Sequence, residues 1–381
     1  MDFTVNKVAL IGLVVIIIVC VSSCASKKLY GTFTNIPIEG NYRESLDWAV
    51  SNGVVGMSLY AGKGDKAFLG SEGLADIQSN TLMTANHKHR IGSITKSFVA
   101  VLTVKLHEQG LLNLDDKVKD WLPHSILKTT QCADTVSIRQ LLQHTSGIDN
   151  YSDNIAFKDS FNKAAEFPWH YQHFLYFTQN TEREGSSTKQ FFYSNTGYLL
   201  LGLIIERATQ LDLAQAMSRY VTEPLQLSNT GFLSETSEIS NLVTGYDKRT
   251  FETDYVSVSS FPLHLSDAGM YSTVQDLARF VKGLFSKQLL FKPTVIEQVT
   301  GSIETDISGT EYGLGFYLQR DRNDQIIKVW HSGHITGTRA MMMYLPQSDE
   351  TLAYMINSSD RRSADVWNLY KLMAESFKFP K

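Results

Sequence analysis

Apolar and polar positions follow two different periods along this chain, and the changes of period separate predicted strands from predicted helices. The residue pattern predicts strands at Val54 to Tyr60 and Ala67 to Ala75. A hairpin through Ala61-Gly62-Lys63-Gly64-Asp65 joins them. Before them, Asn41 to Asn52 carries apolar residues at helical spacing. The pattern therefore predicts that the fold begins with one helix followed by two strands.

The middle of the chain has a helical pattern. From Ser93 an apolar residue recurs at every fourth position until Gly110 ends the helix. Three further helices are predicted at Ser137 to Leu142, Asn195 to Gln210 and Ser272 to Phe285. Ser272 or Thr273 is suited to cap the last of them.

The last part of the chain returns to strands. They are predicted at Tyr312 to Leu318, Gln325 to His331, Arg339 to Leu345 and Thr351 to Asn357, before a closing helix at Ala364 to Phe377. We therefore expect an α/β fold of the α+β kind, with one antiparallel sheet flanked by helices. Residues of about 41–92 and 310–381 form the sheet region, and about 93–309 form a large, mostly helical insertion.

The N-terminus carries a separate signal. Val8 to Val21 is apolar over fourteen residues, which is shorter than the roughly 20 residues of a typical membrane span. Small residues then lead into Cys24. This pattern is similar to a bacterial lipoprotein signal, which implies a signal peptide at 1–23, a lipid on Cys24, a tether at 24–40 and one domain at 41–381. An uncleaved signal anchor is the alternative. Both place the domain outside the cytoplasm, and the first predicts a lipid-anchored protein of the cell envelope that faces the periplasm or the exterior.

Composition and cysteine usage narrow the classes of function. The chain has 381 residues, 19% of them charged, and a formal net charge of −4, so we expect no nucleic-acid partner. Removal of Cys20 with the signal and lipidation of Cys24 would leave Cys132 as the one cysteine of the mature chain. We therefore expect no internal disulfide, no metal site and no cofactor.

The stretch Ser93-Ile94-Thr95-Lys96 carries candidate chemistry. It places a hydroxyl and an amine one helical turn apart, after Gly92 and at the start of an apolar helix. A neighbouring base is what makes a serine hydroxyl an effective nucleophile. Three other Ser-x-x-Lys matches begin at Ser125, Ser160 and Ser186, but none follows a glycine or opens a strongly apolar helix.

Two more motifs lie downstream. Tyr193-Ser194-Asn195 supplies a phenol and a carboxamide at a turn before a buried helix. His331-Ser332-Gly333 ends a predicted strand, where glycine lets a ligand approach the backbone closely.

These motifs together resemble the serine β-lactamase and penicillin-binding protein superfamily. The most similar branch contains class C β-lactamases, D-alanyl-D-alanine carboxypeptidases and related esterases. The resemblance covers about Asn41 to Phe377. Three further stretches support it, at Leu114 to Val118, Leu141 to Ile148 and Ala268 to Thr273.

The resemblance implies a role for each residue. Ser93 matches the nucleophile, Lys96 its partner and Tyr193 the tyrosine that shares the proton transfers. Asn195 matches the amide that holds substrate. His331, Ser332 and Gly333 stand where class C β-lactamases carry Lys-Thr-Gly, and they are expected to bind substrate. Backbone N–H groups of Ser93 and of the strand after Gly333 would hold an oxyanion.

The function implied is a serine hydrolase that forms an acyl-enzyme on Ser93. Its substrates would be D-alanyl peptides, small esters or, weakly, β-lactams. We expect β-lactams to react only weakly because His331 stands where class C β-lactamases carry a lysine, and a histidine provides less fixed positive charge. Candidate partners are thus a small-molecule or peptide substrate, with peptidoglycan fragments among them, and the membrane through the N-terminal lipid. The alternative is a penicillin-binding sensor lipoprotein that binds cell-wall fragments without turnover.

Overall fold

The computed structural model describes most of the predicted domain. Its described residues are 42–130, 132, 134–163, 170–178, 190–233, 238–247, 256–258, 265–285 and 299–359. The predicted signal, Cys24, the tether and the helix Ala364 to Phe377 lie outside these residues and stay predictions. Within the described ranges, no helix combines the length and hydropathy that a membrane crossing requires.

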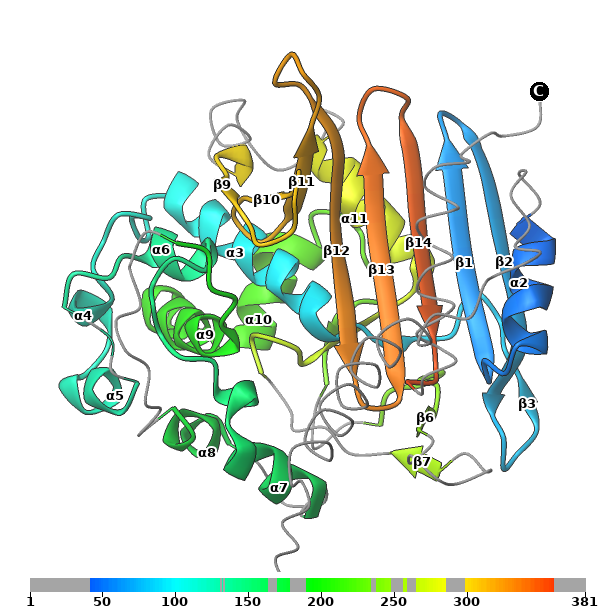
Figure 1. The fold of residues 1–381 in the computed structure, drawn as a ribbon, viewed down its shortest axis with the longest axis horizontal. Helices are drawn as coiled ribbons and strands as arrows, with labels where there is room; N and C mark the ends of the chain where they lie inside the picture. The colour runs from blue at the N-terminus through cyan, green and yellow to red at the C-terminus, as the bar shows by residue number, and fades with distance from the viewer. Residues whose placement is uncertain are drawn as a thin grey trace, which may run out of the picture. The chain divides into compact units, whose positions relative to one another are not determined.

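A nine-stranded antiparallel sheet joins the two ends of the domain (Figure 1). Its strands, in spatial order, are β3 (Thr81–Leu82), β2 (Lys66–Asp76), β1 (Gly56–Lys63), β14 (Glu350–Ile356), β13 (Thr338–Leu345), β12 (Ile326–Ile335), β11 (Tyr317–Arg320), β10 (Glu311–Tyr312) and β9 (Ile303–Glu304). The junction is the pairing of β1 with β14, in which Met57 lies opposite Ile356. The predicted antiparallel sheet built from the first and last parts of the chain is therefore confirmed.

Three of the predicted strands differ clearly from their expected bounds. The first, β1, continues to Lys63, so most of the expected connection Ala61 to Asp65 is strand and the turn is at Gly64-Asp65. The strand expected at Tyr312 to Leu318 is two short strands, β10 and β11, because Gly315 adopts a φ of +79° and the chain reverses there. The strand expected to end at His331 continues to Ile335, since a tight turn at Gly337, with φ of +86°, lets Ile335 pair with Thr338. His331-Ser332-Gly333 therefore lies inside β12 rather than at its end.

The predicted helices form close to their expected positions. They are α2 (Tyr42–Ser51), α3 (Thr95–Glu108), α6 (Ile138–Leu142), α9 (Asn195–Thr209) and α11 (Val274–Phe285). The helix expected from Ser93 begins instead with a single 3-10 turn, η1 (Gly92–Ile94), that leads into α3. Ser137 caps α6 through a capping box with Gln140, as its sequence position suggests.

Shorter elements complete the described fold. The helical ones are α4 (Val118–Trp121), α5 (His124–Thr129), η2 (Tyr151–Asp153), α7 (Ile155–Lys163), α8 (Tyr171–Tyr176), α10 (Leu213–Met217) and a π-helical turn, η3 (Ser218–Thr222). Two small sheets contain β4 (His89–Arg90), β8 (Met270–Ser272) and β5 (Gly231–Phe232), and β6 (Gly245–Asp247) with β7 (Val256–Val258).

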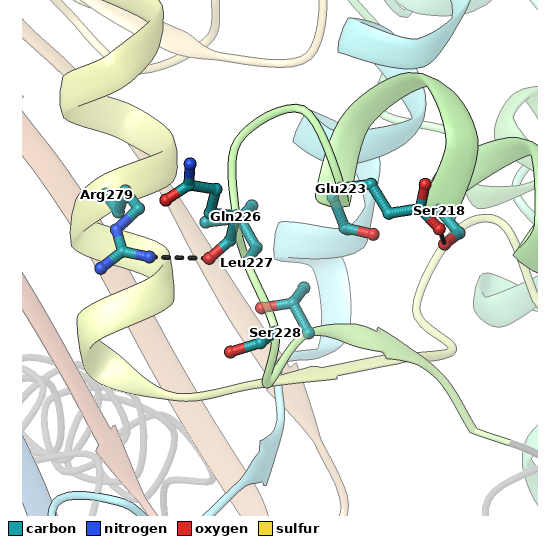
Figure 2. A pocket seen from close by; sticks show the side chains of 8 residues that line it. Ser218, Glu223, Gln226, Leu227, Ser228 and Arg279 are labelled. Atoms are coloured by element: carbon teal, nitrogen blue, oxygen red, sulfur yellow. Dashed lines mark hydrogen bonds between the residues drawn. The ribbon is translucent and has the colours of Figure 1, made fainter.

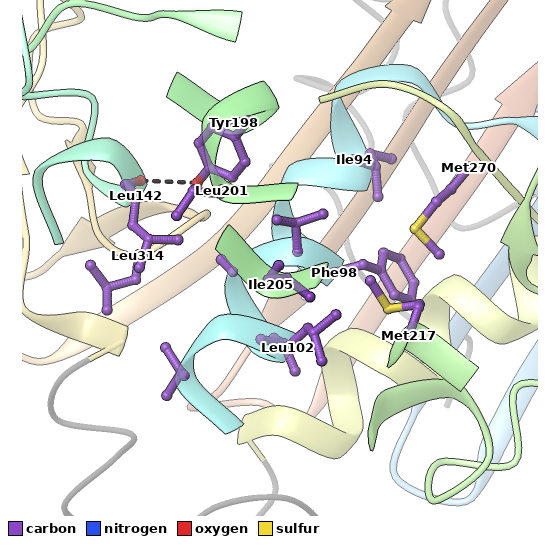
Figure 3. Close-up of a cluster of buried hydrophobic side chains, with 14 of the residues drawn as sticks. Ile94, Phe98, Leu102, Leu142, Tyr198, Leu201, Ile205, Met217, Met270 and Leu314 are labelled. Atoms are coloured by element: carbon purple, nitrogen blue, oxygen red, sulfur yellow. Dashed lines mark hydrogen bonds between the residues drawn. The ribbon is translucent and has the colours of Figure 1, made fainter. Parts of the chain in front are cut away.

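Helix α3 is the centre of the core. Eleven of its fourteen residues are buried, which explains why apolar and small polar side chains occupy all of its faces. Phe98 stacks on Phe280 of α11 with ring centroids 3.7 Å apart. Figure 3 shows Leu102 and Phe98 facing Ile205 of α9 and Met217 at the end of α10. The position of α3 is therefore fixed by apolar packing on several elements.

Hydrogen bonds from distant segments hold the turn that precedes α3. Thr338 of β13 donates to the carbonyl oxygen of Arg90 at 3.1 Å. Met270 of β8 accepts from the backbone N–H of Ile91 at 3.0 Å and donates to the Thr95 hydroxyl at 3.2 Å. Because both small and large sheets contribute, Ser93 has a rigid backbone setting.

Replacement of Leu102 by alanine tests the central role of α3. Leu102 is fully buried, so Leu102→Ala should reduce the free energy of unfolding by about 2 to 5 kcal/mol. Leu82→Ala is the matched control because Leu82 is 70% exposed, and its effect should stay within about 0.5 kcal/mol. Denaturant unfolding followed by circular dichroism measures both. Equal effects of the two variants would contradict this account of the core.

Candidate active site

Ser93 and Lys96 are hydrogen-bonded to each other at the start of α3. Nζ of Lys96 donates to Oγ of Ser93 at 3.3 Å and to the main-chain oxygen of Asp267 at 2.8 Å. The Lys96 side chain is fully buried, whereas Ser93 is partly exposed. The amine thus reaches the hydroxyl from the protein interior, and the residue Ser93 is partly open to solvent.

The charge of Lys96 is set by its surroundings. Burial lowers the pKa of the amine to about 8, and the negative charge of Asp267 acts in the opposite direction. No carboxylate among the described residues lies within ion-pair distance of Nζ. The rings of Tyr193 and Tyr198 lie 5.0 and 5.6 Å from Nζ, measured to their centroids. A substantial neutral fraction therefore exists near pH 8, and a neutral amine can accept a proton.

Tyr193 lies directly before α9 and contacts the same pair. Burial raises the pKa of its phenol, while a hydrogen bond with Ser93 lowers it. Its neighbour Ser194 caps α9 by accepting from Gly197 N–H, and Ser194 N–H donates to Nδ1 of His144 at 3.1 Å. The His144 ring also lies against the Tyr193 ring, with centroids 4.2 Å apart. Cap and ring together fix the tyrosine toward Ser93.

Asn195 is the first residue of α9. Its side-chain Nδ2 donates to Oγ of Ser152 at 3.0 Å, and its backbone N–H donates to Oδ1 of Asn150 at 3.1 Å. The carboxamide is only partly buried. Asn195 is therefore held against Asn150 and the η2 turn, and its role in substrate binding stays a prediction.

His331 lies on β12 with both ring nitrogens bonded inside the protein. Nδ1 lies 2.7 Å from the Ser332 carbonyl oxygen, and Nε2 lies 3.1 Å from the Tyr312 hydroxyl. Burial lowers the pKa of the imidazole to about 3, and the charge of Lys96 acts in the same direction. The ring is therefore neutral, so Nδ1 carries the proton toward the carbonyl and Nε2 accepts from Tyr312. Strand β12 offers no fixed positive charge at this position.

Gly333 lets β12 pass directly against the turn that carries Ser93. A Cβ on Gly333 would overlap the carbonyl oxygen of Ile91 and lie 3.3 Å from the Ser93 nitrogen. A Cβ on Gly92 would lie 2.9 Å from the backbone nitrogen of His334. The backbone N–H groups of Ser93 and His334 thus belong to two segments in direct contact. Ser332, between His331 and Gly333, is partly exposed.

Several residues of this region were not singled out from the sequence. They are Asp267, Tyr312, Tyr198, Tyr151 and His144. Asp267 and His144 each lie in or beside a stretch that carries the family resemblance, which is a usable signal. The three tyrosines carry no comparable signal in the sequence, because a tyrosine in an apolar segment is most often a core residue.

The competing sequence signals lie elsewhere. Ser125 is exposed on α5 and Ser160 lies on α7, while Ser186 is outside the described residues. Nδ1 of His173 accepts from the His170 N–H and so serves the start of α8. Where the structure is described, no three His, Cys, Asp or Glu side chains gather as they would around a metal ion.

A pocket of about 490 Å³ lies between η3 and α11, and Figure 2 shows its lining. Arg279 donates to the Gln226 carbonyl oxygen at 2.7 Å, and Ser218 donates to Glu223 at 2.7 Å. None of the predicted site residues lines this pocket. It is a feature separate from Ser93.

Comparison with known proteins agrees with the fold. The chain is 26% identical to protein flp of Staphylococcus aureus over 313 residues, which is 80% of this chain and 60% of the other. It is 27% identical to penicillin-binding protein 4* of Bacillus subtilis over 321 residues, or 80% of this chain and 68% of the other. The chain therefore corresponds to about 60% of the length of the Staphylococcus aureus relative.

The solved structure of D-amino acid amidase from Ochrobactrum anthropi SV3 superposes with a TM-score of 0.73 at 25% identity and covers 88% of this chain and 98% of the amidase. The model of the family described as Beta-lactamase matches residues 38–374, which is nearly the whole predicted domain. The chain therefore belongs to the Beta-lactamase family.

Proposed function

We propose that this protein is a serine hydrolase that works through an acyl-enzyme on Ser93. The observation that carries the proposal is the hydrogen bond from the buried Lys96 amine, which forms no ion pair within the described part of the chain, to the hydroxyl of the partly exposed Ser93. A positioned base beside a serine is the arrangement that nucleophilic catalysis requires.

In the acylation step, Ser93 Oγ attacks the substrate carbonyl while its proton passes to Nζ of Lys96. The Oγ–C bond forms and the carbonyl electron pair moves to the oxygen. The N–H groups of Ser93 and His334 are placed to hold this oxyanion, since Gly92 and Gly333 bring their two segments together. The proton then reaches the leaving group as its bond to carbon breaks, and water later releases the acyl group.

The directions of the two pKa shifts favour Lys96 over Tyr193 as the first base. Burial lowers the pKa of Lys96 to about 8 and raises that of Tyr193. Near neutral pH the phenol keeps its proton, so it can donate to Lys96 or to the leaving group but cannot start the reaction as a phenolate. We infer that Tyr193 passes protons outward after Lys96 has received one.

The substrates we propose are D-alanyl or other D-amino acid amides and peptides, small esters and, weakly, β-lactams. Two names support this choice, the penicillin-binding protein and the D-amino acid amidase to which the chain is similar. The neutral His331 offers no charge for a substrate carboxylate. We therefore expect amides and esters without a terminal carboxylate to react better than those with one.

A fluorophosphonate probe tests the nucleophile. Wild-type chain should gain the mass of one probe, and Ser93→Ala should lose labelling at least 100-fold because no other described serine has a hydrogen-bonded buried amine. Ser125→Ala, which alters an exposed serine of another Ser-x-x-Lys match, should label like wild type. Intact-mass spectrometry measures all three. Labelling of Ser93→Ala at the wild-type rate would show that the nucleophile is elsewhere.

Turnover of a p-nitrophenyl ester and of a D-alanyl amide separates the hydrolase from the sensor. A hydrolase gives a steady-state rate after any initial burst. A single stoichiometric burst without later turnover would instead favour the sensor that binds cell-wall fragments.

The pH dependence of ester hydrolysis tests the role of Lys96. The amine must be neutral to accept the Ser93 proton, so kcat/KM should rise with pH and level off above about pH 8, the pKa of the buried amine. Lys96→Arg should remove this rise together with most of the activity, because a guanidinium stays charged. A wild-type profile that stays flat between about pH 6 and 9 would contradict a base with this pKa.

Substitution of Gly333 tests the contact between β12 and the Ser93 turn. Gly333→Ala would force the two backbones apart, because its Cβ would overlap the Ile91 carbonyl oxygen. We expect ester hydrolysis to fall by roughly 100-fold or more, the loss typical of a misplaced oxyanion donor. Gly197→Ala is the control, since its Cβ would meet its nearest neighbour at an ordinary 3.6 Å. Ester hydrolysis by Gly333→Ala within about twofold of wild type would overturn this assignment of the oxyanion donors.

A further inference from the structure

Asp267 presents both its backbone and its side chain to the region around Lys96. Its main-chain oxygen accepts from Nζ of Lys96 at 2.8 Å. Its Oδ2 accepts from the Tyr151 hydroxyl at 2.6 Å. Oδ1 is buried and has no hydrogen-bond partner in the described parts of the chain. Since Asp267 is only 1% exposed, this carboxylate lies in the interior with one of its two oxygens unpaired.

An unpaired buried carboxylate oxygen is costly, so its persistence beside a buried amine needs a reason. The other groups that face Lys96 carry no negative charge near neutral pH. They are the Ser93 hydroxyl, the phenols of Tyr193 and Tyr198, and the imidazoles of His144 and His331, whose pKa values are both lowered. Burial raises the pKa of the Asp267 carboxyl, whereas the charge of Lys96 and the hydrogen bond from Tyr151 lower it. Among the described residues, Asp267 is therefore the acidic group that can compensate an ammonium at this position.

We propose that Asp267 is the positioning residue of Lys96, which holds the amine through its main-chain oxygen and stabilises, through its carboxylate, the ammonium that forms when Ser93 is deprotonated. This proposal rests on the proposed function of Ser93 and Lys96. The proton leaves Ser93 Oγ and stays on Nζ until the leaving group takes it, so the positive charge is transient and internal. A carboxylate that orients a base and stabilises its charged form serves this purpose in other serine hydrolases as well.

Tyr151 fixes the direction of the carboxylate. It lies on η2, where its hydroxyl donates to Asp267 and its backbone N–H donates to the Thr196 hydroxyl at 3.1 Å. The same turn supplies Ser152, which accepts from Asn195. Movements of η2 would thus affect the charge partner of Lys96 and the carboxamide of Asn195 together.

Asp267→Asn tests the proposal, because it keeps the shape of the side chain and removes its charge. The readout is the rate of fluorophosphonate labelling of the full chain as a function of pH. Loss of the negative charge lowers the pKa of Lys96, so the acidic limb of the profile should move by about one unit to lower pH. The plateau rate should fall by roughly three- to tenfold, because Lys96 becomes a weaker base.

Two further variants make the test specific. Asp276→Asn removes another buried carboxylate, which lies in the first turn of α11 and accepts from Asn229 and Thr230, and it should leave the acidic limb in place. Tyr151→Phe removes the hydrogen bond that stabilises the Asp267 carboxylate, and it should move the limb in the same direction as Asp267→Asn but less.

Three outcomes decide the matter. A shifted limb in Asp267→Asn with an unshifted control supports the proposal. Slower labelling at every pH with no shift would overturn it, since that is the result of a purely structural role. Absence of labelling in the wild type would instead refute the proposed function, which keeps the two failures distinguishable.

Discussion

The burial of Lys96 is the constraint on which the rest of the site depends. Burial of an ammonium in the interior costs roughly several kcal/mol of folding free energy unless an opposite charge compensates it. Among the described residues, no carboxylate forms an ion pair with Nζ of Lys96. Burial lowers the pKa of this amine to about 8, so a neutral fraction exists near that pH, and we propose that the neutral amine is the base for Ser93. The aromatic rings around it and the carbonyl oxygen of Asp267 then tolerate both charge states.

The sheet supplies the other half of the site through its backbone. Strand β12 passes so close to η1 that only glycine fits at position 333. This contact joins the helical region, which carries Ser93 and Lys96, to the large sheet, which carries His334. Stability and chemistry are therefore coupled here, because the packing that holds α3 in the core also fixes the distance between two candidate oxyanion donors.

The sequence was sufficient for the parts of the structure that depend on local pattern. Apolar periodicity located α3, α9 and the outer strands, and the antiparallel sheet followed from strands at both ends of the domain. The sequence pattern did not predict that β10 and β11 are two separate strands, because their separation depends on the positive φ of Gly315. The Ser93, Tyr193 and His331 motifs were visible because they are local in sequence. Asp267 was not, since its importance arises only when β8 brings it beside Lys96.

We propose that Ser93 attacks from a turn whose own N–H group, together with that of His334, holds the oxyanion. A crystal structure of the protein with a boronic acid tests it most directly, because boron forms a tetrahedral adduct with an attacking serine. We predict a bond from Ser93 Oγ to boron, one boronate oxygen within hydrogen-bond distance of the nitrogens of Ser93 and His334, and Lys96 Nζ beside Oγ. An adduct on another residue, or a boronate oxygen that points away from both nitrogens, would contradict the account.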